Sequence, residues 1–267
     1  MSTASRGILV TGASRGIGAA IASAFAARGD RVAVHHRSAT DRARDVLDGL
    51  PGEGHLLVRA DIADPDAVAA MVGAAVTGLG RIDVLVNNAA LFTDEPVAGS
   101  RRLGHPIEDT SYADWVTVWR RTVEVNLLGT ANVTWCVARH MIDTEPAAGV
   151  PRGRIVNVGS RGAYRGEPDV PAYGASKAGL HAFGQSMALA LGAHGIAVTA
   201  GAPGFVATDM ASQSLTGPGG DVVRAQSPFG RVARAGEIAA AVVFLASPEA
   251  EWASGAVLDL NGASYLR

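Results

Sequence analysis

The segment ILVTGASRGIG at residues 8–18 decides the fold class of this chain. It opens with a short apolar run at residues 8–10, continues as a turn with three glycines, and leads into an alanine-rich stretch with helical periodicity at residues 19–28. A strand, a glycine-rich turn and a helix in this order are typical of nucleotide-binding α/β proteins. The glycine backbone can approach a pyrophosphate, and the N–H groups of the helix start favour its charge. We therefore predict a nucleotide-binding turn here.

The spacing of these glycines is G-x-x-x-G-x-G, which differs from the G-x-G-x-x-G of the common dinucleotide fingerprint. Glycines in such a place can also serve only to close a tight turn between a strand and a helix. The rest of the chain has to distinguish these two interpretations.

Strands and helices alternate through the rest of the sequence. We predict seven strands, at residues 8–10, 31–36, 55–60, 82–86, 154–158, 196–200 and 257–260. The helices that we predict lie at residues 19–28, 41–50, 65–77, 111–141, 173–191 and 237–246. This alternation favours one doubly wound parallel sheet with helices on both faces, and we expect a single α/β domain over residues 1–267. Ligands of such sheets bind beyond the carboxyl ends of the strands.

Composition excludes several classes of protein. The formal net charge is −2 and no run of like charges stands out, so we expect no nucleic-acid partner. Cys136 is the only cysteine, so the chain can form no internal disulfide and no cysteine metal site. This fits a reducing cytoplasm, and we expect no bound metal. The longest apolar run, residues 238–246, is far shorter than the roughly 20 residues of a membrane span. We expect neither a membrane anchor nor a signal peptide.

Tyr173 and Lys177 are candidates for acid–base chemistry. They are four residues apart in a predicted helix, so their side chains lie on one face, a turn apart. A free tyrosine has a pKa of about 10, and we expect the lysine ammonium to lower it. Ser160, thirteen residues upstream, can polarise the oxygen that Tyr173 protonates or deprotonates. Taken alone, this spacing also fits an ordinary helix start on the surface.

The end of the second predicted strand indicates which cofactor is used. An NAD-binding site usually has Asp or Glu about 20 residues beyond the glycine turn, but this strand ends in His35-His36-Arg37-Ser38 without an acid. The fork of Arg37 suits a 2′-phosphate, and Arg15 in the glycine turn can approach the same phosphate. Both arginines can instead be solvated surface residues. We predict a preference for NADP(H), with NAD(H) as the alternative.

Taken together, these features resemble the short-chain dehydrogenase/reductase family over nearly the whole chain, in particular its 3-oxoacyl reductases. Residues 11–18 are similar to the family's glycine motif, and residues 87–90 to its N-N-A-G motif with Ala90 in place of glycine. The other matches are Asp61, the mid-helix Asn126, Ser160, the Y-x-x-x-K of Tyr173 and Lys177, and Pro203-Gly204 with Val206 and Thr208. By helix pattern alone, Asn126 fits a satisfied core amide.

The resemblance implies a Rossmann-like sheet, an NAD(P)-dependent oxidoreductase and a homotetramer. It implies catalytic roles for Ser160, Tyr173 and Lys177, and a water-anchoring role next to the lysine for Asn126. The residues that we assign to the cofactor are Gly12, Ser14, Arg15, Gly16, Ile17, Gly18, His36, Arg37, Ser38, Asp61, Ile62, Asn88, Ala89, Ala90, Tyr173, Lys177, Pro203, Gly204, Val206 and Thr208. A catalytically silent nucleotide sensor on the same fold is the alternative, although it would be expected to lack part of the catalytic set.

The substrate remains open between three classes: a 3-oxoacyl thioester on a carrier protein, a free ketone or polyol, and a pteridine-like ring. Pteridine reductases commonly have aspartate where Ser160 stands, which ranks them last. No lysine or arginine lies between residues 178 and 195, which argues mildly against an acidic carrier. We expect residues 91–109 to form a loop over the pocket mouth and residues 209–230 to form a lid with a hinge at residues 217–220. The expected pocket lining is Leu91, Phe92, Arg161, Tyr164, Phe205 and Met210.

Overall fold

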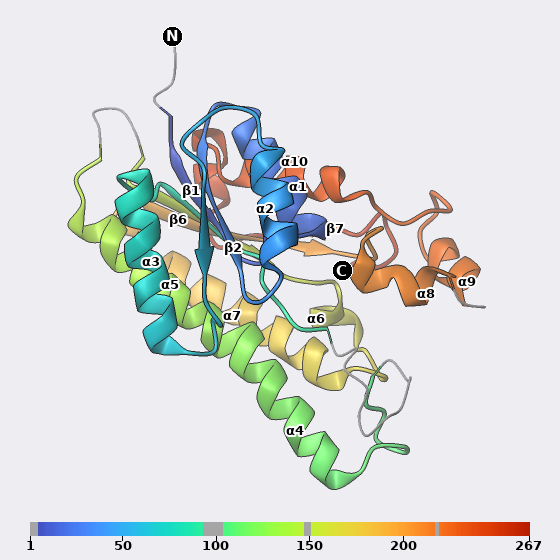
Figure 1. Cartoon of the computed structure of the whole chain (residues 1–267). Coiled ribbons are helices and arrows are strands. Elements are labelled where there is room, and N and C mark those ends of the chain that lie inside the picture. The colour runs from blue at the N-terminus through green and yellow to red at the C-terminus, as the bar shows by residue number, and fades with distance from the viewer. Residues whose placement is uncertain (1–4, 93–103, 147–150, 217–218) are drawn as a thin grey trace.

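A seven-stranded parallel sheet forms the centre of the computed structural model, which describes residues 5–92, 104–146, 151–216 and 219–267 (Figure 1). The strand order is β3-β2-β1-β4-β5-β6-β7. The strands are β1 (Gly7–Val10), β2 (Arg31–His36), β3 (Leu56–Arg59), β4 (Val84–Asn87), β5 (Gly153–Val158), β6 (Ile196–Pro203) and β7 (Val257–Leu260). This order, in which the chain turns back between β3 and β4, confirms the predicted doubly wound sheet.

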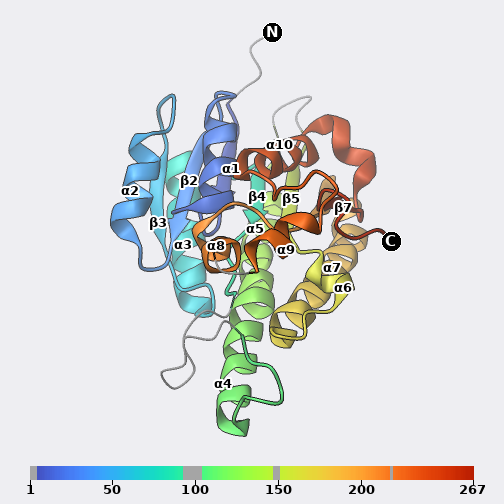
Figure 2. The same cartoon turned by 90° about the vertical axis from the view of Figure 1, so that its right-hand side faces the viewer.

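Helices cover both faces of the sheet (Figures 1 and 2). They are α1 (Gly16–Ala26), α2 (Thr40–Asp48), α3 (Pro65–Leu79), α4 (Tyr112–Val123), α5 (Thr130–Asp143), α6 (Gly162–Arg165), α7 (Pro171–Gly192), α8 (Ser212–Thr216), α9 (Gly220–Ala225) and α10 (Ala235–Leu245). Three shorter helical turns are η2 (Glu124–Gly129), η3 (Asp209–Ala211) and η4 (Pro248–Ala253).

The alternation of side chains along the strands explains the two helical layers. In β1, Ile8 and Val10 join the apolar core under α1, α2 and α10, whereas Leu9 joins the core under α3, α5 and α7. All three side chains are fully buried. Because both faces are covered, the strands are almost entirely apolar instead of alternating with polar residues.

The predicted helix at residues 111–141 is one rod that changes its winding in the middle. It begins at α4, which is capped by Ser111, passes through the π-helical turn η2, and continues as α5. Asn126 lies in this π turn and hydrogen-bonds the backbone of Leu91 twice, with Leu91 N donating to Oδ1 at 2.7 Å and Nδ2 donating to the Leu91 carbonyl at 3.0 Å. The π turn therefore aims a buried amide at the segment that follows β4.

Several predicted boundaries were wrong, among them the start of α1 at Gly16, the end of β6 and the start of α7. Strand β6 extends to Pro203 because its last four residues pair with β7, from Ala200 opposite Val257 to Pro203 opposite Leu260. Helix α7 begins at Pro171, a residue whose fixed φ suits a first helical turn, so Tyr173 lies inside the helix and not at its start.

The two predicted pocket loops are only partly within the described residues. Residues 93–103 of the 91–109 loop and residues 217–218 of the expected hinge lie outside them. The next part of the first loop docks on the start of α7, where His105 is fully buried and accepts a hydrogen bond from Ala172 N at 3.2 Å. The expected lid contains η3, α8 and α9, which cross in front of the sheet in Figure 2. Within the described ranges, no helix is both long and apolar enough to span a membrane.

Candidate active site

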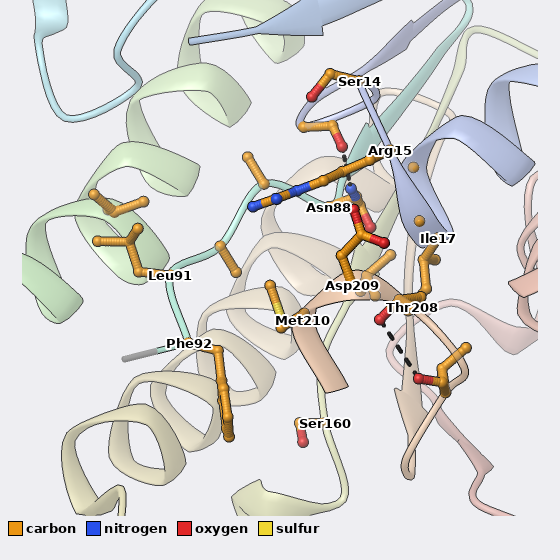
Figure 3. Close-up of a pocket in the computed structure, with 18 of the residues that line it drawn as sticks. Ser14, Arg15, Ile17, Asn88, Leu91, Phe92, Ser160, Thr208, Asp209 and Met210 are labelled. Atoms are coloured by element: carbon orange, nitrogen blue, oxygen red, sulfur yellow. Dashed lines mark hydrogen bonds between the residues drawn. The ribbon is translucent and has the colours of Figure 1, made fainter. Parts of the chain in front are cut away.

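One cavity of about 510 Å³ opens where β1, β2, β4, β5 and β6 end. Every residue that the sequence assigned to the cofactor lines it, together with Ser160. Figure 3 shows Ser14 and Arg15 toward one end of this cavity, and Phe92, Met210 and Ser160 toward the other. The cavity is therefore elongated, with the glycine turn at one end and the candidate catalytic residues at the other.

The glycine turn is held in shape by Thr11 and Asn88. The Thr11 hydroxyl accepts hydrogen bonds from Asn88 N at 2.9 Å and Ala89 N at 3.0 Å, and the Asn88 amide donates to the carbonyls of Thr11 and Gly12 at 2.9 and 3.0 Å. Gly12 has a positive φ of 64°, and a β-carbon on it would lie 2.8 Å from the Cα of Ala89. This position requires glycine because both its φ and the close approach of Ala89 exclude a side chain.

The start of helix α1 fits a bound phosphate. Its first turn contains no acidic residue, and its N-cap residue, Arg15, makes no side-chain capping bond. The positive end of the helix dipole and its N–H groups are thus left for an anion, as in a pyrophosphate site. A β-carbon on Gly16 would lie 3.2 Å from Thr208 Cγ2, so the two sides of the cavity approach closely here.

Arginines surround the end of the cavity that contains the glycine turn. Arg15 and Arg37 are both exposed and line it, and so does Arg42, which pairs with Asp209 at 3.1 Å and which sequence reasoning missed. Asp61 accepts a hydrogen bond from Arg121 at 2.8 Å and lies 3.9 Å from Arg37. Burial acts to raise the pKa of Asp61, but the hydrogen bonds and charges of these partners outweigh burial and hold the pKa below its usual value.

Two histidines at the end of β2 take different roles. His35 accepts a hydrogen bond from Gly12 N at 2.9 Å and contacts the Ala60 carbonyl at 3.1 Å, and burial lowers its pKa to about 4. A neutral imidazole thus supports the glycine turn from behind, a role the sequence did not reveal. His36 is also buried, lines the cavity, and has no hydrogen-bond partner on either ring nitrogen among the described residues.

Tyr173, Ser160 and Lys177 meet at the far end of the cavity. Tyr173 and Lys177 come from α7, and Ser160 follows β5, where its hydroxyl accepts a hydrogen bond from Gly162 N at 3.0 Å. The Lys177 ammonium donates to the Val158 carbonyl at 2.7 Å and lies 5.8 Å from the centre of the Tyr173 ring. Sequence position alone predicted this grouping, and the three side chains do line one space.

The predicted lowering of the Tyr173 pKa by Lys177 was wrong for this structure. Burial raises the pKa of Tyr173 to about 12, the Ser160 hydroxyl acts to lower it, and the charge of Glu167 raises it further. Burial also lowers the pKa of Lys177 to about 8. Because the Lys177 ammonium lies toward the Val158 carbonyl, the cost of desolvating the Tyr173 phenolate is the largest effect on the pKa of Tyr173.

Asn126 does not line the cavity. It is almost fully buried, and besides Leu91 its amide donates to Ser176 Oγ at 3.0 Å. Ser176 in turn donates to the Tyr173 carbonyl at 2.7 Å. Asn126 therefore links η2, the segment after β4 and the helix that carries Tyr173, and it acts on the site by positioning these elements.

Five of the six predicted pocket residues line the end of the cavity near Ser160, namely Leu91, Phe92, Arg161, Phe205 and Met210. Phe92 packs edge-on against Tyr173 with ring centres 5.0 Å apart. Tyr164 does not line the cavity, because its ring packs against His181 and beneath the Arg267 guanidinium. Glu167 lines the cavity and was missed, since no motif marks it.

A protein-family model described as enoyl-(acyl carrier protein) reductase matches residues 12–262, which include every residue that lines the cavity. The chain belongs to the short-chain dehydrogenase/reductase family. It is accordingly an NAD(P)-dependent oxidoreductase. The resemblance drawn from the motifs is thereby confirmed.

Relatives within the short-chain dehydrogenase/reductase family match along nearly their whole length. The chain is 38% identical over 264 residues to a cis-4-hydroxycyclohexanecarboxylate dehydrogenase of Sinomonas cyclohexanicum, covering 97% of this chain and 96% of the relative. It is 35% identical over 260 residues to a 3-oxoacyl-(acyl-carrier-protein) reductase of Vibrio cholerae, with the same two coverages. A crystal structure of a short-chain dehydrogenase of Burkholderia cenocepacia in complex with NADP superposes with a TM-score of 0.81 at 32% identity, over 97% of each chain.

Proposed function

We propose that this protein is an NADP(H)-dependent oxidoreductase that interconverts a ketone and a secondary alcohol, with Ser160, Tyr173 and Lys177 as its catalytic residues. The observation that carries the proposal is the grouping of these three side chains at one end of a cavity whose other end is a phosphate-binding turn. The whole chain, residues 1–267, then acts as one cofactor-binding domain.

The proposed mechanism assigns one task to each side chain. When bound, the nicotinamide supplies or accepts the hydride. The Ser160 hydroxyl hydrogen-bonds the substrate oxygen and stabilises its developing negative charge. Tyr173 gives a proton to this oxygen in the reductive direction and takes it back in the oxidative direction. Lys177, by family resemblance, holds the nicotinamide ribose.

The raised pKa of Tyr173 favours reduction near neutral pH. With a pKa of about 12, the side chain is a phenol there and is ready to donate. Alcohol oxidation needs the phenolate or a concerted transfer, so it gains from higher pH.

The preference for NADP(H) is supported by the charges at the adenosine end of the cavity. Arg15, Arg37 and Arg42 line it, and the two acids beside them are already paired, Asp61 with Arg121 and Asp209 with Arg42. A 2′-phosphate would gain charge-assisted hydrogen bonds there. The NADP complex of the Burkholderia relative is consistent with this preference, and NAD(H) remains the alternative.

The substrate that we favour is a free ketone or its alcohol, with the carrier-bound thioester as the second candidate. The relatives named above act on both kinds of substrate. Of the arginines near this region that could bind an acidic carrier, Arg154 is buried and paired with Glu251 and Arg161 is buried, whereas Arg165 is exposed. We therefore expect soluble thioesters, if they are reduced, to work about as well as carrier-bound ones.

The experiment that tests the proposal is a panel of cyclohexanones, linear ketones, polyols and 3-oxoacyl thioesters, each assayed with NADPH or NADP by absorbance of the reduced nicotinamide. We expect at least one ketone to be reduced. A panel without any turnover would favour the catalytically silent alternative.

We also propose that the protein is a cytoplasmic homotetramer with small-molecule partners only. The single cysteine favours the cytoplasm. Two large apolar side chains are exposed to solvent in a single protomer and would be buried in an assembly. Trp135 on α5 is 67% exposed, and Leu189 on α7 is 87% exposed. Such faces are typical of symmetric interfaces.

We expect sedimentation equilibrium at micromolar concentration to give a mass near four times 27.2 kDa. Charged residues at the two exposed sites, as in Trp135→Glu with Leu189→Glu, should dissociate the assembly. A wild-type mass near that of one chain would contradict the tetramer.

A further inference from the structure

Glu167 is an acid at the substrate end of the cavity that neither the motifs nor the proposed mechanism uses. It follows α6 and lines the same cavity as Ser160 and Tyr173. Its side chain is half-buried and packed on Gly162, where a β-carbon would lie 2.9 Å from both Cγ and Oε1. This packing fixes the carboxyl group beside the reacting end of the cavity.

The two arginines near Glu167 are bonded elsewhere. Arg161 donates to Gln226 and Ser264 and stacks on Phe205, with its Cζ 5.1 Å from the ring centre. Arg165 donates to the same Gln226 oxygen at 2.8 Å. The Glu167 carboxyl makes no side-chain hydrogen bond or ion pair with any residue that the structure describes.

Apolar side chains provide most of the remaining surface around the substrate. Leu91, Phe92, Phe205 and Met210 line this end of the cavity, and the Arg161 guanidinium lies over the Phe205 ring. Glu167 is thus the one carboxyl that faces this end of the cavity without a partner among the described residues. The charges of Arg161 and Arg165 offset part of the charge of this carboxyl, but its oxygens accept no hydrogen bond from either arginine. In a partly desolvated site such a carboxyl attracts hydrogen-bond donors and disfavours anions.

We propose that Glu167 selects substrates, so that the enzyme prefers ketones carrying a hydrogen-bond donor, a hydroxyl or an ammonium group, and discriminates against ketones carrying a carboxylate. This inference rests on the proposed carbonyl reduction at the same site. It separates this chain from an enzyme for a ring carboxylate, even though the relative from Sinomonas is named for one.

The test compares ketones that share a ring and differ in one substituent. The parent is cyclohexanone, and the derivatives are 4-oxocyclohexanecarboxylate, 4-hydroxycyclohexanone and 4-aminocyclohexanone. We measure kcat and KM for each with NADPH, in the unmodified protein and in Glu167→Gln. The control variant is Asp169→Asn, which removes an exposed acid from the same loop outside the cavity.

We expect Glu167→Gln to raise kcat/KM for the carboxylate about tenfold and to lower it about tenfold for the amine, mostly through KM, with little change for cyclohexanone. Asp169→Asn should leave all ratios near those of the unmodified protein. If Glu167 had only a structural role, Glu167→Gln would change kcat/KM in the same direction for every ketone.

Two outcomes would overturn the inference. One is a carboxylate preferred over cyclohexanone by the unmodified protein, and the other is a uniform response of the series to Glu167→Gln. Failure of the proposed function has a different signature, namely no reduction of these or any other panel ketones by the unmodified protein.

Discussion

Replacement of Tyr173 by phenylalanine should lower kcat by a factor of roughly 10² to 10⁴, the range typical of a lost general acid–base group. The phenol is the only group in our mechanism that exchanges a proton with the substrate oxygen. Phenylalanine keeps the ring that packs edge-on against Phe92, so the helix and the cavity should persist. NADPH binding, followed by fluorescence or calorimetry, should therefore change little.

A matched control for this variant is Tyr164→Phe. Tyr164 lies close in sequence, but its ring packs beneath Arg267 outside the cavity. We expect near-parental turnover for this protein. If Tyr173→Phe also retained near-parental turnover, Tyr173 would not be the proton donor.

The second large effect that we expect is a reversal of cofactor choice by Arg37→Asp. The new carboxylate repels a 2′-phosphate and can accept a hydrogen bond from the 2′-hydroxyl of NADH. The change removes a charge-assisted hydrogen bond and adds a repulsion, so the ratio of kcat/KM for NADPH to that for NADH should fall on the order of 10² to 10³. The measurement is kcat/KM for both cofactors in both proteins.

Arg44→Asp is the matched control for Arg37→Asp. Arg44 is an exposed arginine of α2 that does not line the cavity. The same charge change there should alter the ratio by no more than a few-fold, through long-range electrostatics. Equal or better use of NADH by the unmodified protein would refute the NADP(H) preference.

The sequence predicted the fold well because its strongest signals are local. The 8–18 segment contains the strand, the turn and the helix start within eleven residues, and Gly12 is required there by its φ and by contact with Ala89. The apolar strands and the alternating helices then leave a doubly wound sheet as the natural arrangement. The boundary of β6 was wrong because its end is determined by pairing with β7, which is a non-local contact.

The candidate site was predicted where motifs mark it and missed where only tertiary contacts do. Arg42 and Asp209 are 167 residues apart and meet only in the folded chain. Glu167 sits in a loop without a motif, and its place in the cavity follows from packing on Gly162. Asn126 interrupts an apolar stripe, which marked the position, but its π-helical turn and its bonds to Leu91 could not be read from that signal.

The Tyr173 pKa shows how the environment overrides a sequence rule. Spacing puts a lysine one turn away, and this favours the phenolate. Burial has the opposite effect and is larger in this structure, so that the pKa rises to about 12. The degree of burial depends on Phe92 and the surrounding cavity, which no local spacing encodes.

Transfer of deuterium from NADPH tests the central claim most directly. NADPH labelled at carbon 4 of the nicotinamide, on one face or the other, is incubated with the best ketone of the panel, and the alcohol is analysed by mass spectrometry. Our account predicts one deuterium on the carbinol carbon from one of the two labelled cofactors, and almost no labelled alcohol from Tyr173→Phe in the same time. An alcohol without deuterium from either cofactor, or equal labelling by Tyr173→Phe, would contradict it.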